Sequence, residues 1–93
     1  MQSDELIVKG EDALKIAEIL TSTSLKILQI LSKESLDVSS IAERLGLSEA
    51  YVSEQIQLLE ENGLIKASYQ RGKRGVRKIC RASVSKITII IEL

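Results

Sequence analysis

The sequence predicts a single α+β domain in which helices come first and strands follow. Apolar residues recur at helical spacing between residues 11 and 62, and beyond Gly63 they alternate with polar residues as in strands. The 93 residues are too few for a second core, so we expect one domain over residues 1–93. Almost all of the apolar residues are Ile, Leu, Val and Ala, which predicts an aliphatic core.

An N-terminal arm or short strand is expected over residues 1–10, where a short apolar run stops at Gly10. Two helices are expected over residues 11–33, and either Ser22 or Ser24 can cap the second. This second helix is apolar on most of its sides. It is therefore expected to lie at the centre of the fold.

A pair of helices joined by a tight turn is expected over residues 38–62. Ser40 and Glu43 have the spacing of a capping box at the start of the first helix, and Gly46 supplies the left-handed residue that ends it. Ser48 is expected to cap the second helix. The buried stripe of that helix is expected to consist of Val52, Ile56 and Leu59.

The alternating pattern predicts a β-hairpin over residues 64–82, with a glycine-bounded basic turn at residues 70–75. Tyr69 is expected to pack at the base of this hairpin. A further strand is expected over residues 84–93, with one face formed by Ile87, Ile89, Ile91 and Leu93. An apolar strand left at an open edge invites aggregation, so the N-terminal arm, the first helix or a second subunit should cover it. This need for cover is the main reason to predict a homodimer.

Charge is divided unevenly along the chain. The thirteen basic and thirteen acidic residues cancel, yet residues 1–61 hold twelve acids against five bases, and residues 62–91 hold eight bases and no acid. A segregated basic segment on a neutral chain indicates a local contact with a polyanion. The alternative is a solvated surface loop, which is what most charge runs are.

Several classes of function are disfavoured by composition. The chain has no histidine, which is the commonest general base and metal ligand, and its one cysteine, Cys80, cannot form an internal disulfide. We therefore expect no enzymatic activity, no cofactor and no metal site. A signal sequence and an apolar run of membrane-spanning length are both lacking, so the expected location is the cytoplasm, with no membrane partner.

The most informative segment is residues 38–65, VSSIAERLGLSEAYVSEQIQLLEENGLI, whose spacing matches a helix-turn-helix. It resembles the winged helix-turn-helix transcriptional regulators of the ArsR-like (arsenic-repressor-like) and MarR-like type, found in bacteria and archaea. The upstream LTSTSLKILQILSK is similar to the second helix of that family, and the downstream ENGLIKASYQRGKRGVRKI is similar to its wing. About two thirds of the chain is covered by the resemblance.

The resemblance implies a homodimer that binds a pseudo-palindromic site in double-stranded DNA. The second helix of the motif would enter the major groove, and the basic hairpin would contact phosphates or the minor groove. The residues expected to face bases are Ser48, Glu49, Ala50, Tyr51, Ser53, Glu54 and Gln55. The residues expected to contact phosphates are Arg71, Lys73 and Arg74 at the turn, with Arg77 and Lys78 behind them.

The chain departs from the family pattern in two places. Glu54 stands where these families often carry a basic residue, so binding should be salt-sensitive and should depend on the wing. The cysteines of metal-responsive members are replaced by Asp37, Val38 and Ser39, which disfavours metal sensing. Two assignments stay open: Tyr51 either covers the edge of its helix or contacts DNA, and Cys80 is either a small buried hydrophobe or a redox switch.

A second class of function competes with DNA binding. In that class the chain is a protein-interaction module, or a subunit of a larger complex, whose acidic helix meets a basic partner. The acids that favour it are Glu49, Glu54, Glu60 and Glu61.

Overall fold

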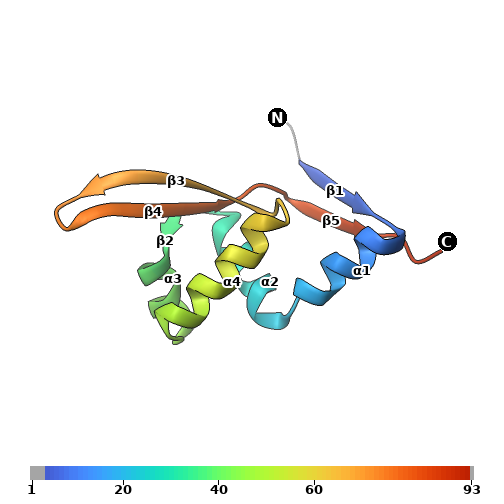
Figure 1. Cartoon of the computed structure of the whole chain (residues 1–93), viewed down its shortest axis with the longest axis horizontal. Helices are drawn as coiled ribbons and strands as arrows, with labels where there is room; N and C mark the ends of the chain where they lie inside the picture. The colour runs from blue at the N-terminus through green and yellow to red at the C-terminus, as the bar shows by residue number, and fades with distance from the viewer. Residues whose placement is uncertain (1–3, 93) are drawn as a thin grey trace.

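The computed structural model describes residues 4–92, which form four helices and two small sheets. Figure 1 shows the helices beneath the sheets. The elements in chain order are β1 (Glu5–Val8), α1 (Gly10–Ile19), α2 (Ser22–Leu31), β2 (Leu36–Asp37), α3 (Val38–Leu45), α4 (Glu49–Glu61), β3 (Ile65–Gly72), β4 (Gly75–Ala82) and β5 (Lys86–Ile89). The predicted α+β winged helix-turn-helix architecture is confirmed.

The N-cap of helix α2 lies one residue before the earlier of the two caps that the sequence suggested. It is Thr21, whose hydroxyl accepts a hydrogen bond from the Ser24 backbone N–H at 3.1 Å. In return the Ser24 hydroxyl accepts from the Thr21 N–H at 2.7 Å and donates to the Ile19 carbonyl at 2.8 Å. Ser24 is fully buried, and these hydrogen bonds satisfy its hydroxyl. They also link the end of α1 to the start of α2.

Helix α3 starts at Val38, so the expected capping box of Ser40 and Glu43 is wrong. The N-cap is Asp37, whose Oδ1 accepts from the Ser40 backbone N–H at 2.9 Å. Asp37 also ends β2, a two-residue strand that the sequence did not predict, so the helix has to start immediately after it. At the other end Gly46 has φ = 67°, the left-handed conformation expected of the turn between α3 and α4.

The hairpin β3–β4 forms the centre of a three-stranded antiparallel sheet ordered β2-β4-β3. The strands run up to Gly72 and Gly75, which pair with each other, so the turn is only the dipeptide Lys73-Arg74. It is shorter than the six residues expected. Tyr69 is 65% exposed, so the expectation that it packs at the base of the hairpin is wrong.

A separate two-stranded sheet joins the two ends of the described chain. β1 pairs in parallel with β5, with Leu6 opposite Ile87 and Val8 opposite Ile89. The N-terminal arm therefore covers the C-terminal strand, which was one of the three kinds of cover expected. The strand itself is shorter than predicted, because it ends at Ile89. Leu93 lies outside the described residues.

The core is aliphatic, as predicted, and lies between the helices and the inner face of the β2-β4-β3 sheet. The stripe of α4 that was expected to be buried is buried, and it packs with residues of α2, α3 and the hairpin. The residues of this core that are at most 2% exposed are Ile27, Ile41, Val52, Ile56, Leu59, Leu64, Ile65 and Cys80. α2 is less enclosed than expected, since Leu25 is 43% exposed.

Candidate nucleic-acid interface

The first turn of α4 is fixed by its own cap. The Ser48 hydroxyl accepts a hydrogen bond from the Tyr51 backbone N–H at 3.1 Å, so Ser48 is the N-cap that the sequence predicted. The Ser39 hydroxyl lies 3.5 Å from the Glu49 carboxylate, which brings the starts of α3 and α4 together. A capped first turn gives the outward side chains of α4 a defined orientation.

Most of the predicted base-facing residues are exposed. Ser48, Glu49, Ala50, Tyr51, Ser53 and Glu54 are all exposed, and Gln55 is half-buried. Because Val52, Ile56 and Leu59 face the core, helical geometry places Ala50, Glu54 and Gln57 along the outermost line. Glu54 therefore lies at the middle of the exposed face of α4, and Tyr51, which is 39% exposed, lies beside it.

The tip of the hairpin carries the predicted cations. Arg71, Lys73 and Arg74 are exposed and make no ion pair with any of residues 4–92. We call these three side chains the wing-tip cations. Figure 1 shows the hairpin projecting from the body over α3 and α4, away from the end that holds α1, β1 and β5. β4 contacts α3 and β3 contacts α4, so the hairpin lies directly against both helices of the helix-turn-helix.

The two cations behind the tip are paired with acids. Arg77 donates to Asp37 Oδ2 from its Nε at 3.1 Å and from a terminal nitrogen at 2.7 Å. Lys78 Nζ lies 2.7 Å from Glu60 Oε1. Neither acid was expected from the sequence to pair with the hairpin, and Glu60 was named only among the acids that favour a basic protein partner. The five predicted phosphate contacts therefore divide into the three unpaired wing-tip cations and the two paired cations, Arg77 and Lys78.

Charge on this surface is divided between its two elements. α4 carries four acids and no base, whereas the hairpin over residues 65–82, its turn included, carries seven bases and no acid. A polyanion is attracted by the hairpin and repelled by α4, so the hairpin must provide the electrostatic part of any binding to DNA.

Asp37 is held in its charged form. Hydrogen bonds from Ser40 and then from Arg77 lower its pKa from the usual 3.8 to about 2. A carboxylate whose pKa is lower in the folded than in the unfolded state stabilises the fold above pH 3.8, and this contribution is lost as the pH falls through about 2.

We expect Asp37→Ala to lower the free energy of unfolding by about 1 kcal/mol at pH 7, because it removes both the helix cap and the partner of Arg77. Asp37→Asn is the matched control, since an asparagine side chain also caps helices well. Urea unfolding at pH 7 and at pH 2 measures both variants. If the difference in free energy of unfolding between Asp37→Ala and the parent were the same at pH 2 as at pH 7, the charged carboxylate would not be the source of that difference.

The single cysteine of the chain, Cys80, is part of the core. Cys80 is fully buried, and its burial raises the pKa of the thiol. These features favour the packing interpretation over a redox switch.

A second region of interest is formed by α1, the start of α2, β1 and the C-terminal segment, away from the hairpin tip. Several large apolar side chains are uncovered there, although the arm covers β5. We call them the apolar end: Ile7, Leu14, Leu25, Ile89 and Ile91, which are 58%, 67%, 43%, 41% and 91% exposed. The sequence indicated that Ile89 and Ile91 lie on an apolar strand face that needs cover and that α2 is apolar on too many sides for a single core, but it gave no signal for Ile7 or Leu14.

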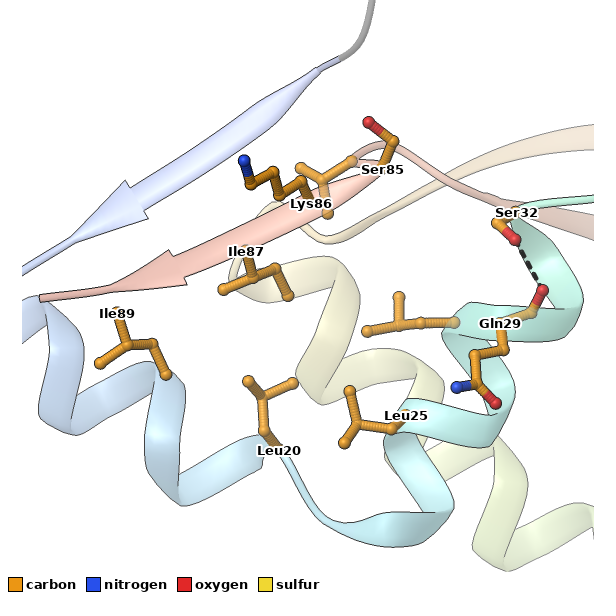
Figure 2. A pocket seen from close by; sticks show the side chains of 10 residues that line it. Leu20, Leu25, Gln29, Ser32, Ser85, Lys86, Ile87 and Ile89 are labelled. Carbon is orange, nitrogen blue, oxygen red and sulfur yellow. Dashed lines mark hydrogen bonds between the residues drawn. The ribbon is translucent and has the colours of Figure 1, made fainter.

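An open groove of about 300 Å³ adjoins this apolar end. Figure 2 shows Leu20, Leu25, Ile87 and Ile89 around the space between β5 and the helices α1 and α2. The groove is mainly apolar, with Gln29, Ser32, Ser85 and Lys86 at its rim. An uncovered apolar surface of this kind is typical of an interaction site.

Among residues 4–92, no three His, Cys, Asp or Glu side chains gather where they could hold a metal ion. Within the same residues, none of the helices is long and apolar enough to cross a membrane.

Comparisons with known proteins identify one family. The model of the arsR family of bacterial regulatory proteins matches residues 21–67, which is about half of the chain and includes α2, α3, α4 and the start of β3. The search of curated proteins finds no match.

Solved structures give the same fold. The homodimeric winged helix-turn-helix DNA-binding domain of a possible ArsR-family transcriptional regulator from Mycobacterium bovis is 24% identical, with a TM-score of 0.66. The alignment covers 78% of this chain and 65% of that one. Reduced HlyU from Vibrio cholerae is 21% identical, with a TM-score of 0.67 and coverage of 81% and 76%.

A variant of ZitR from Lactococcus lactis has higher identity over a shorter segment. It is 32% identical, with a TM-score of 0.62, and the alignment covers 69% of this chain and 43% of ZitR. The chain thus spans less than two thirds of the length of the Mycobacterium bovis domain and less than half of ZitR.

Proposed function

The chain belongs to the arsR family of bacterial regulatory proteins, and from that premise we propose that it is a transcriptional regulator that binds double-stranded DNA as a homodimer. The observation that supports the proposal is the set of unpaired wing-tip cations on a hairpin whose strands contact α3 and α4, the two helices of the motif. A polyanion that contacts the tip can at the same time meet α4. The proposal includes no enzymatic role, and it includes a cytoplasmic location, where the DNA ligand is expected.

Each element has a distinct role in the proposal. α4 enters the major groove, where Glu54 accepts a hydrogen bond from a cytosine amino group and Tyr51 contacts a base or a sugar. The remaining contacts from this helix come from Ser48, Glu49, Ala50, Ser53 and Gln55. The wing-tip cations neutralise phosphates, which supplies affinity without regard to sequence.

Dimerisation involves the apolar end in this proposal. Its exposed side chains and the adjoining groove need cover, and a second copy of the chain supplies it by two-fold symmetry. The Mycobacterium bovis domain with the same fold is homodimeric. Because the apolar end lies opposite the hairpin tip, the two hairpins point outward and the two α4 helices can reach successive major grooves, about 34 Å apart.

A salt titration on a duplex of arbitrary sequence, followed by fluorescence anisotropy, tests the proposal. Direct binding predicts that the logarithm of the affinity falls linearly with the logarithm of the salt concentration, with a slope of about −0.9 for each phosphate contact. Absence of binding at about 50 mM salt and micromolar protein would refute DNA binding.

The acidity of α4 favours a second candidate function. Four carboxylates and no base on one exposed helix suit a basic protein surface, so the module could act in a larger complex. The same titration separates the two candidates, since this one predicts no salt-sensitive affinity for duplex DNA. Binding to a basic partner should then be weakened by Glu49→Gln and Glu54→Gln together.

A further inference from the structure

Strand β4 is held to the helix-turn-helix by two neighbouring ion pairs. Arg77 and Lys78 are consecutive in β4, so their side chains leave opposite faces of the hairpin. Arg77 reaches Asp37, where β2 ends and α3 begins, and Lys78 reaches Glu60 in the last turn of α4. Both helices of the DNA-binding motif are therefore joined directly to the same place on the hairpin.

These two pairs lie where the hairpin leaves the body. Lys78 is three residues from Gly75, so the tip extends about 10 Å beyond the pairs at about 3.3 Å per residue. Beyond this place both strands are exposed at nearly every residue, and none of the other described elements lies beside them. A rotation of the hairpin by about 10° at the pairs would move the wing-tip cations by about 2 Å, enough to break a charged hydrogen bond to a phosphate.

The acids are the unexpected members of these pairs. Asp37 and Glu60 lie on a surface that is to meet a polyanion, and each neutralises a cation that could otherwise contact a phosphate. Only 17% of the Asp37 side chain and 35% of the Glu60 side chain are exposed. If the only role of this surface were to gather positive charge, both carboxylates would weaken it.

We propose that Asp37 and Glu60 are positioning residues for DNA binding, which fix the angle of the hairpin relative to α4 so that the wing-tip cations and α4 reach one duplex. The inference rests on the proposed function, because it supposes that DNA is the ligand. It assigns Arg77 and Lys78 to holding the hairpin, whereas Arg71, Lys73 and Arg74 make the phosphate contacts.

Charge alone and positioning predict opposite results for the same substitution. Glu60→Gln removes a negative charge and frees Lys78, so charge alone predicts tighter binding and a salt slope steeper by about one. If Glu60 instead positions the hairpin, Glu60→Gln should weaken DNA binding by about threefold, and the salt slope should not become steeper. The matched control is Glu61→Gln, which removes the same charge from the adjacent residue of α4, whose carboxylate contacts Gln57 and not the hairpin. It should leave affinity unchanged or slightly raise it.

Exchanging the charges of one pair supplies a second test. Glu60→Lys alone and Lys78→Glu alone should each weaken binding, because each puts like charges at the contact. The double variant has the net charge of the parent and restores an ion pair, so its affinity should return to within about twofold of the parent. Asp37→Asn, which keeps the helix cap, should weaken binding about threefold, as Glu60→Gln does.

An orientation measurement without DNA keeps this inference separable from the proposed function. Residual dipolar couplings of the backbone amides report the angle between β3–β4 and the helices α3 and α4. In Glu60→Gln the hairpin couplings should shrink relative to those of the helices, while Glu61→Gln should match the parent. If the parent bound no DNA, the proposed function would fail whatever the couplings showed. Tighter binding by Glu60→Gln, or unchanged hairpin couplings, would overturn the positioning role alone.

Discussion

Replacing Arg71, Lys73 and Arg74 together with alanine is expected to weaken binding to duplex DNA of every sequence by at least about a hundredfold at 0.1 M salt. The reason is that these cations are unpaired among the described residues and, in the proposed function, supply the phosphate contacts, while the helix beside them is acidic. A dimer loses six such cations. The salt slope should become shallower by about 0.9 for each phosphate that is no longer neutralised, or by about five in total.

Fluorescence anisotropy at several salt concentrations measures both effects. The control replaces Lys9, Lys26 and Lys33 with alanine, which removes the same charge from the residue before α1, from α2 and from the turn after α2, and leaves the hairpin intact. It should change the affinity and the slope much less. If the wing-tip variant and the control behaved alike, the phosphate contacts would have to lie elsewhere.

If the chain dimerises through the apolar end as proposed, Leu14→Glu is expected to convert the dimer to a folded monomer. Leu14 is 67% exposed in the single chain, so the substitution leaves the core of each subunit intact. In a dimer that buries the apolar end, the substitution removes two buried leucines, each of which stabilises the dimer by about 2 kcal/mol. It also buries two carboxylates, which destabilises the dimer further. The dimer dissociation constant should rise by at least about a thousandfold, and affinity for a two-half-site duplex should fall with it.

Sedimentation equilibrium gives the oligomeric state, and thermal unfolding by circular dichroism shows that the variant is folded. Ser35→Glu is the control, because it adds the same charge at an exposed position between α2 and β2. It should stay dimeric. A dimeric Leu14→Glu variant would mean that the two copies meet through a different face.

The helix-turn-helix could be predicted from the sequence because its signals are local. Ser48 caps α4 through a backbone N–H three residues away, Gly46 ends α3 by its own conformation, and the buried stripe follows helical spacing. The capping box predicted for Ser40 and Glu43 was wrong even though the signal is local. Asp37 and Ser40 are both good caps, and the short pairing of β2 with β4 decided between them.

The ion pairs that hold the hairpin could not be predicted. Asp37 and Arg77 are 40 residues apart, and Glu60 and Lys78 are 18 apart, so no spacing rule links them. The local excess of basic residues predicted that Arg77 and Lys78 contact phosphates, because their acidic partners come close to them only in the folded chain. The exposure of Tyr69 was missed for a related reason, since alternation tells which face of the hairpin a residue occupies but not where the core beneath it ends.

The parallel pairing of β1 with β5 has a consequence for synthesis on the ribosome. About eighty residues separate the two strands, so β1 is made several seconds before its partner emerges, at about 5–20 residues per second. The helices α2 to α4 can meet during that interval, whereas β4 ends at Ala82, shortly before β5 begins at Lys86, and so is made at nearly the same time as β5. The β1–β5 sheet and the hairpin are therefore completed at the same stage of synthesis, after the helices have had time to pack.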